Sequence, residues 1–238
     1  MAEFWRIVFY QPIFNLLVLI YNTVPDMGAA ILLLTLVFKL AMHPLSKKAL
    51  HSQKALQDLQ PKVEALKAKF KDQKEAMAKE LMELYKTEKV SPFSSCLPLL
   101  FQLPFLIALY QVFGSGLNSG SLDLLYPFVP NPGQLSDLSL GFWHLTQASW
   151  VLAVITGAAQ FWQSKMLIRT KPPVASPGAK DEGMATMMNK QMLYMMPALT
   201  VIFGFRLPAG LVLYWLVNIL YTVAQQHFAF RHHGAKTA

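Results

Sequence analysis

The sequence predicts an all-α integral membrane protein with five membrane-spanning helices. Hydrophobic residues make up 54% of the 238-residue chain and charged residues only 14%, whereas a soluble domain carries about 25% charged residues. The chain is long enough for about five spans with connecting loops, and it contains five apolar segments. Asp and Glu are absent from all five segments. The single cysteine, Cys96, also rules out a disulfide within the chain.

The N-terminal segment, residues 1–26, is apolar but interrupted by polar residues and by Pro12, which can begin a helix. We expect residues 12–23 to form an amphipathic helix that lies at the outer surface of the membrane. The alternative is that residues 4–23 form an additional span. The opening residues have neither the basic start nor the cleavage site of a secretory signal peptide.

The remaining chain alternates between apolar and polar segments. The expected order is a first span (27–45), a cytoplasmic helical hairpin (46–95), a second span (96–114), an outer loop (115–146), a third span (147–166), a cytoplasmic loop (167–191), a fourth span (192–206), a tight turn with the fifth span (207–229), and a cytoplasmic tail (230–238). Because only Leu207 to Gly210 separate the last two apolar segments, these should form an antiparallel pair.

Basic residues indicate the orientation of the chain in the membrane. With the N-terminus outside, eleven basic residues fall between Lys47 and Lys89, five between Lys165 and Lys190, and two in the tail, while only Arg6 and Arg206 lie outside. Cytoplasmic loops of membrane proteins carry such an excess. The net charge of +8 is therefore explained by topology and by contact with anionic lipids, and nucleic-acid binding is not needed to explain it.

The predicted hairpin has apolar residues at spacings of three and four, which is typical of amphipathic helices that pair along a seam. The seam residues that we expect to dock are Leu59, Val63, Leu66, Phe70, Met77 and Leu81. Pro61 should begin or kink a helix, and Lys71 to Gln73 should form the tip. The pattern fits both a hairpin that packs on itself and a mobile docking arm.

Lys39 is the most unusual residue, because it lies inside the otherwise apolar run Gly28 to Leu45. A charge near the centre of a spanning helix costs at least about 2.5–3.5 kcal/mol. Since the apolar segments contain no acidic residue, no counter-ion within the membrane is expected for Lys39. An unpaired cation facing a water-filled cavity is a candidate functional group.

Four stretches of this sequence resemble the YidC-type membrane protein insertase family. They are TLVFKLAMHPLS (Thr35 to Ser46), LQPKVEALKAKF (Leu59 to Phe70), ELYKTEKVSPFSSCLPLLFQLPFLIALY (Glu83 to Tyr110) and MMPALTVIFGFRLPAGLVLYWLVNILYTVAQQ (Met195 to Gln226). The resemblance extends over residues 10–230. It is to a short bacterial form that lacks the large outer-face domain of some relatives.

The resemblance implies a particular architecture and function. Five spans would surround a hydrophilic groove that is open to the cytosol and the lipid and closed toward the outside. The protein would be an insertase and chaperone in the bacterial inner membrane that moves hydrophobic segments with short polar flanks into the bilayer without hydrolysing nucleotides. Its implied partners are nascent membrane proteins and lipids, while the ribosome, targeting factors and a Sec channel remain open as further partners.

The family's groove positions correspond to a small set of residues here. Lys39 stands where the bacterial pattern usually has arginine, and lysine offers a compact point charge instead of a planar fork. For Thr35, one helical turn away, a hydrogen bond to its own helix backbone is an equal alternative. For the other positions the alternatives are helix packing and interfacial placement. The candidate groove residues are Lys39, Thr35, Gln102, Gln160, Tyr214, Trp215 and Asn218.

No motif for catalysis or for binding a cofactor occurs in the sequence. The six histidines lack metal-ligand spacing, and no Walker loop, nucleophile elbow or Rossmann glycine pattern is found. We therefore expect no metal, no cofactor and no enzymatic activity. The two alternative functions are a small-anion transporter, which would need a continuous polar path, and a membrane scaffold, which would leave Lys39 unexplained.

Overall fold

The computed structural model describes residues 2–70, 73–90, 97–114, 117, 119–167 and 191–234. This part of the chain is mostly helical, as predicted. Its elements, including the π-helical turns η1 and η4 and the 3-10 helix η3, are α1 (Ala2–Trp5), η1 (Arg6–Tyr10), α2 (Gln11–Thr23), α3 (Met27–Ala41), α4 (His43–Asp58), α5 (Gln60–Lys69), α6 (Lys74–Thr87), α7 (Leu97–Gly114), η3 (Ser119–Leu124), β1 (Leu138–Ser139), β2 (Trp143–His144), α8 (Trp150–Leu167), η4 (Gln191–Met195), α10 (Met196–Gly204) and α11 (Ala209–Gly234).

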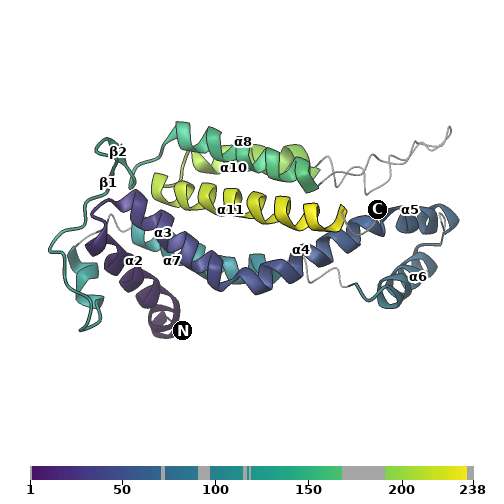
Figure 1. Ribbon diagram of the computed structural model, residues 1–238, viewed down its shortest axis with the longest axis horizontal. Coiled ribbons are helices and arrows are strands. Elements are labelled where there is room, and N and C mark those ends of the chain that lie inside the picture. The colour runs from purple at the N-terminus through teal and green to yellow at the C-terminus, as the bar shows by residue number, and fades with distance from the viewer. Residues whose placement is uncertain are drawn as a thin grey trace.

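Helix α11 runs through the middle of an elongated bundle (Figure 1). It contacts α8, which pairs with α10 on one side, and it contacts α3 and α7 on the other. Helix α2 packs against α3 and α7. The α5–α6 pair lies at one end of the long axis and the strands β1 and β2 lie at the opposite end.

By length and composition, one helix in the described part of the chain could cross a membrane by itself, Glu3–Thr23. A second candidate arises if Met27–Ala41 and His43–Leu56, which are bent by 67° at their junction, are taken as one span. The segments Gln102–Gly114 and Leu193–Gly204 are apolar but shorter. The predicted number of five spans therefore remains a prediction.

The N-terminal helix is longer than the expected 12–23 and packs into the core. α1, η1 and α2 follow one another without a break. Phe14, Leu17 and Val18 of α2 are fully buried in the cluster of apolar side chains that α2, α3, α7 and the start of α11 share. The helix therefore holds its place by burial against its neighbours, whichever of the two predicted placements it takes in the membrane.

Helices α8 and α10 approach each other closely through small residues. A Cβ atom on Gly157 of α8 would overlap the side chain of Val201, and one on Gly204 of α10 would lie 2.7 Å from the Cβ of Ala153. Small residues four apart on one helix, such as Ala153 and Gly157, allow two backbones to pack tightly in membrane proteins. This contact fixes the pair that lies beside α11.

The chain changes direction at Met42, between α3 and α4, slightly before residue 45, where the first span is predicted to end. Helix α5 begins at Gln60 with Pro61 in its first turn. Leu59, in the break between α4 and α5, is buried, and the other predicted seam residues are partly buried. The α5 and α6 helices contact each other, and residues 71–72 of the predicted tip lie outside the described residues.

The C-terminal part also departs from the expected boundaries. Ala209 and Gly210, expected in the turn, are the first residues of α11, and this helix continues to Gly234. A side chain on Gly210 would collide with the ring of Phe113. Nearly all of the predicted cytoplasmic loop 167–191 and the end of the tail lie outside the described residues.

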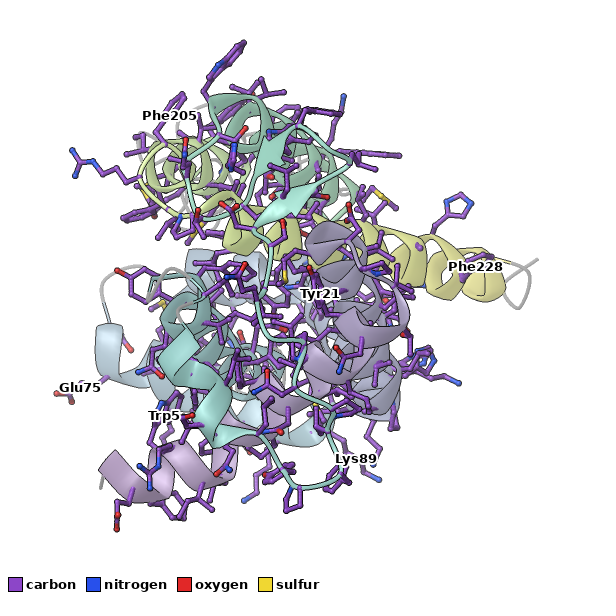
Figure 2. The ribbon with its side chains drawn as sticks, turned by 90° about the vertical axis from the view of Figure 1, so that its left-hand side faces the viewer. Trp5, Tyr21, Glu75, Lys89, Phe205 and Phe228 are labelled. Atoms are coloured by element: carbon purple, nitrogen blue, oxygen red, sulfur yellow. The ribbon has the colours of Figure 1, made fainter. Side chains whose placement is uncertain are left out.

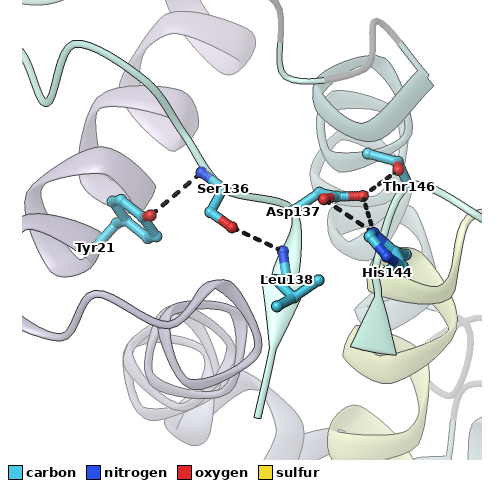
Figure 3. Close-up of polar contacts among 6 residues, drawn as sticks. All are labelled: Tyr21, Ser136, Asp137, Leu138, His144 and Thr146. Atoms are coloured by element: carbon cyan, nitrogen blue, oxygen red, sulfur yellow. Dashed lines mark hydrogen bonds and ion pairs between the residues drawn. The ribbon is translucent and has the colours of Figure 1, made fainter. Parts of the chain in front are cut away.

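The loop 119–146 is bound to α2 by side-chain hydrogen bonds. Asn15 donates from Nδ2 to the Leu124 carbonyl (3.0 Å) and accepts at Oδ1 from the Tyr126 amide (2.6 Å). The Tyr21 hydroxyl accepts a hydrogen bond from the Ser136 amide at 3.2 Å (Figure 3). These contacts attach the loop to α2 at Asn15 and Tyr21.

Candidate functional site

Helix α11 carries a stripe of polar residues four positions apart: Tyr214, Asn218, Thr222 and Gln226. Residues at this spacing share one face of a helix, and twelve residues extend for about 18 Å at 1.5 Å per residue. The Tyr214 and Gln226 side chains are each 1% exposed. A polar stripe that is buried at both ends and partly buried between them thus follows about half the length of α11.

Helix α3 presents its own polar residues, Thr35 and Lys39, one turn apart, and α3 packs against α11. Thr35 is fully buried and Lys39 is 8% exposed. The Lys39 ammonium donates a hydrogen bond to Thr222 Oγ1 at 3.4 Å. Among the described residues, Lys39 forms no ion pair with a carboxylate.

The hydroxyl of Thr222 connects Lys39 to the α11 backbone. Thr222 Oγ1 donates to the Asn218 carbonyl at 2.8 Å and so accepts from Lys39 with its lone pair. The Lys39 ammonium also lies 5.8 Å from the centre of the Tyr221 ring, within the range of cation–π attraction. One hydroxyl and one aromatic face thus surround this buried charge.

Four buried side-chain atoms in the described part of the chain have no hydrogen-bond partner. They are Gln102 Nε2 on α7 and Tyr214 OH, Asn218 Oδ1 and Gln226 Oε1 on α11. Leaving one buried polar group unpaired costs about 1–3 kcal/mol. Three of the four lie on the same stripe as Thr222, the residue that accepts a hydrogen bond from Lys39. We call Thr35, Lys39, Gln102, Tyr214, Asn218, Thr222 and Gln226 the polar cluster.

Aromatic rings join the three helices of the polar cluster. Phe38 of α3 stacks on Phe105 of α7 with ring centres 4.1 Å apart, and Phe105 packs against Tyr214 of α11 at 5.1 Å. Gln102 lies one turn before Phe105 and thus on the same face of α7. The polar cluster therefore has an apolar wall formed by these rings.

The candidate groove residues predicted from the sequence do not all have the same surroundings in the structure. Thr35 donates to the Ile31 carbonyl at 2.6 Å, which is the backbone alternative raised by the sequence. Trp215 packs against the small apolar cluster of Ala159, Ile219 and Val223, whereas Tyr214 packs against Phe105. Gln160 of α8 is half-buried. The contacts of the described residues do not bring Trp215 or Gln160 together with the polar cluster.

Sequence reasoning missed two members of the cluster, Thr222 and Gln226. The signal that could have identified them is the spacing of four that they share with Tyr214 and Asn218. The stripe ends beside a further contact, in which Nδ1 of His43 lies 2.9 Å from Gln225 Nε2 and 3.2 Å from the Tyr221 hydroxyl. This contact ties the start of α4 to α11 at the end of the stripe nearer to α5 and α6.

The polar cluster has groups suited to binding a polar guest or water. Among the described residues, no group of three His, Cys, Asp or Glu side chains could hold a metal ion. The cluster instead combines one cation with amide and hydroxyl groups. Such a set can accept a carboxylate, a peptide group or water in surroundings that are otherwise apolar.

A buried cation and open hydrogen-bonding positions inside an apolar helical bundle are features of helical membrane proteins with a polar pathway. Comparison with known proteins identifies the family. The family model described as 60Kd inner membrane protein matches residues 19–236, and the chain belongs to this family.

Individual relatives agree with the family assignment. The chain is 35% identical over 227 residues to a protein of Histophilus somni named membrane protein insertase YidC, and the match covers 95% of this chain and 37% of that protein. Proteins of the same name from Actinobacillus succinogenes and Pasteurella multocida are 35% and 34% identical over 227 residues. The chain thus spans well under half the length of the curated relatives it matches. The predicted resemblance to the YidC-type family is confirmed.

Proposed function

We propose that this chain is a membrane protein insertase, in which the polar cluster receives the short polar flank of a hydrophobic segment. The observation that carries the proposal is that three unpaired polar atoms lie on the same stripe of α11 as Thr222, which contacts the buried Lys39. These groups offer hydrogen bonds to a guest at a depth where lipid offers none. The names of the relatives support the same function.

The proposed mechanism is the local replacement of water. A peptide group that enters hydrocarbon without a partner costs several kcal/mol. Gln102, Asn218 and Gln226 would supply hydrogen bonds to the flank, and Lys39 would attract its acidic residues. The hydrophobic segment would then leave sideways into lipid, driven by burial of its apolar surface. A membrane potential that is positive outside would also pull an acidic flank outward.

The length of the polar stripe suits a pathway that crosses only part of the membrane. The stripe extends for about 18 Å, compared with a hydrocarbon thickness of about 30 Å. Beyond Tyr214, the start of α11 packs into the apolar core, where Gly210 lies against Phe113. A small-anion transporter would need polar groups through this region as well, so the closed end favours the insertase over the transporter.

The proposed topology has five spans, with the N-terminus outside and the C-terminus in the cytoplasm. α5 and α6 then lie on the cytoplasmic side, near the end of the stripe that carries Gln226, and β1 and β2 lie outside (Figure 1). The basic residues of the 46–90 segment support this orientation. In this arrangement the α5–α6 hairpin can receive a nascent segment before it reaches the polar cluster. It can also be where the ribosome, a targeting factor or a Sec channel docks.

Complementation tests this proposal directly. Cells depleted of their own insertase would express the wild type, Lys39→Arg, Lys39→Ala or a deletion of residues 62–86. Insertion of a two-span substrate with a short acidic outer loop would be scored by protease protection, with expression and membrane integration checked by immunoblotting.

We expect the wild type and Lys39→Arg to restore insertion and the other two variants to fail. Equal rescue by Lys39→Ala would remove the electrostatic part of the mechanism. If a well-expressed, membrane-integrated wild type failed, the scaffold alternative would gain support.

A further inference from the structure

The tip of the hairpin formed by β1 and β2 exposes two large apolar side chains, Leu140 and Phe142, which are 70% and 68% exposed. The tip lies at the end of the bundle opposite α5 and α6 (Figure 1). No charged residue occurs between Leu138 and Trp143. The apolar character of this tip is unusual for a turn exposed to water.

The backbone of the turn makes Leu140 more unusual still. The Phe142 amide donates to the Ser139 carbonyl at 3.2 Å, and the two residues between them, Leu140 and Gly141, have φ of 52° and 78°. Hairpin turns with two positive φ angles normally use Asn, Asp or Gly, because this region is unfavourable for bulky side chains. Neither backbone preference nor packing within the chain accounts for a leucine at position 140.

The turn is mounted rigidly on the bundle. Asp26 accepts hydrogen bonds from the Leu140 amide at 2.6 Å and from the Ser139 hydroxyl at 3.0 Å. A side chain on Gly28 would overlap Ser139, so the hairpin lies directly on the start of α3. An apolar tip held in this way loses little conformational entropy when it docks.

The base of the hairpin is fixed by a second set of contacts (Figure 3). Asp137 accepts from the Thr146 hydroxyl at 2.5 Å and lies 3.3 Å from His144 Nδ1. The Asp137 pKa is held below its ordinary value, chiefly by the hydrogen bond from Thr146. The polar groups of the hairpin are therefore used at its base, which leaves the tip apolar.

Other exposed apolar side chains lie at the same end of the bundle. The Trp143 indole donates to Ser149 Oγ at 3.2 Å, and the next residue, Trp150, is 68% exposed. The loop after β2 also binds the start of α11, where the Gly210 amide donates to the Leu145 carbonyl at 2.8 Å. Phe205, which precedes the turn between α10 and α11, is exposed and lies at the edge of the molecule in the end view (Figure 2).

Further along α8 and α10, four more apolar residues are exposed: Val154, Ile155, Ile202 and Phe203. In a membrane protein such a face is covered by lipid. Next to Phe205, the exposed guanidinium of Arg206 supplies a charge complementary to lipid phosphate. Tryptophan and arginine are residues that occupy the boundary between hydrocarbon and headgroups.

We propose that the hairpin tip inserts Leu140 and Phe142 into the boundary between phospholipid headgroups and acyl chains, and so anchors the outer end of α3 to the membrane. The occupant is lipid, because the tip continues the lipid-facing surface of α8 and α10. The inference concerns lipid contact alone and does not depend on insertase activity.

Depth-dependent quenching tests the proposal in the full-length protein. A Cys96→Ala protein would carry one new cysteine, Phe142→Cys or the control Gln134→Cys, which lies exposed in the same loop. Each would be labelled with a polarity-sensitive fluorophore and reconstituted in vesicles of phosphatidylethanolamine and phosphatidylglycerol containing a nitroxide lipid. We expect several-fold stronger quenching and a blue-shifted emission at position 142. Equal quenching at 142 and 134 would overturn the proposal, and would be the outcome if the tip instead docks a protein.

A second variant separates anchoring from folding. Leu140→Asn suits the positive φ of the turn, so the thermal stability of the detergent-solubilised protein should be unchanged or higher. The same variant should reduce the quenching of a label at position 142. A loss of thermal stability would show that Leu140 serves the fold, and unchanged quenching would show that it does not insert. Either result contradicts the inference.

Discussion

The ammonium group of Lys39 and the hydroxyl of Thr222 lie 3.4 Å apart, although the two residues are separated by 183 positions in the chain. Thr222 donates its own proton to the Asn218 carbonyl, which leaves the hydroxyl oxygen free to accept from Lys39. The only Lys or Arg side chain of α3 is thereby directed toward the polar stripe of α11. This relationship connects Lys39, which the sequence marks as unusual, to Thr222, which was not among the predicted groove residues.

Replacing the hydroxyl of Thr222 should weaken insertion without unfolding the protein. Thr222→Val keeps the shape of the side chain but removes the acceptor for Lys39. Losing one hydrogen bond of about 1 kcal/mol corresponds to a roughly five-fold slower insertion step. Protease-protection time courses would measure this rate, with Thr222→Ser as the matched control that keeps the hydroxyl. Equal rates for the valine and serine variants would exclude a role for the contact.

The hydrogen bonds of Asp26 should make the attachment of the β1–β2 hairpin to α3 sensitive to acid. Burial raises the pKa of Asp26, but hydrogen bonds from the Ala29 and Leu140 amides and the Ser139 hydroxyl outweigh it, so the pKa lies below the ordinary 3.8. A carboxyl group with a lowered pKa stabilises the folded state fully above its unfolded value, and this stabilisation is lost as the pH falls through the folded value.

Hydrogen exchange would report this loss at the Leu140 amide. Its protection factor should be constant above pH 3.8 and should fall at lower pH. Asp26→Asn keeps one oxygen acceptor and should flatten the dependence. Asp26 is also the N-cap of α3, where its carboxylate accepts from the Ala29 amide at 2.8 Å, so Asp26→Ala should cost about 0.5–2 kcal/mol of stability. A profile for Asp26→Asn that falls as steeply as that of the wild type would assign the titration to another group.

Enlarging Gly157 should separate α8 from α10. Gly157→Val places a side chain where Val201 already lies, and overpacking of this kind costs about 1–3 kcal/mol. Ala158→Val adds bulk at the next, exposed position and serves as the control. Thermal unfolding in detergent should show a lower midpoint for the first variant only. If both variants were equally stable, the close approach of the two helices would not contribute to stability.

The stability of the α5–α6 hairpin should depend more on its apolar seam residues than on its surface charges. Leu59 is buried between α4 and α5, and Leu59→Ala should cost about 2–5 kcal/mol. The exposed ion pair of Lys62 and Glu88 should contribute at most about 1 kcal/mol, so Lys62→Ala should have a small effect. Protection of α5 and α6 against proteolysis would compare the two. A larger loss for Lys62→Ala would reverse this ranking.

The helical character of the chain and its family could be predicted from the sequence, because apolar periodicity and long motifs are local signals. The sequence also marks Lys39 as unusual, since no Asp or Glu occurs in the apolar segments. The burial of α2 could not be predicted. Its polar partners, such as the Leu124 carbonyl that binds Asn15, lie more than 100 positions away.

The candidate site could be predicted only in part, for a related reason. Tyr214 and Trp215 are adjacent in sequence, and family position favoured both, but neighbouring helical residues point in directions about 100° apart. The structure directs Tyr214 toward Phe105 and Trp215 toward the apolar cluster of Ala159, Ile219 and Val223. Thr222 looked like an ordinary helix residue until α3 placed Lys39 beside it. Which face of a helix meets which neighbour is a tertiary property that periodicity alone does not determine.

Site-specific crosslinking during translation would show whether the polar cluster contacts the polar flank of a nascent segment. A photoreactive residue would replace Asn218 in the polar cluster or, as control, Val154 on the exposed face of α8, and a stalled nascent chain with a short acidic flank would be presented to membranes. We expect the flank to crosslink to position 218 and not to position 154, and we expect Lys39→Ala to reduce the amount of the crosslinked species. Equal crosslinking from both positions, or none from 218 while the substrate still inserts, would contradict it.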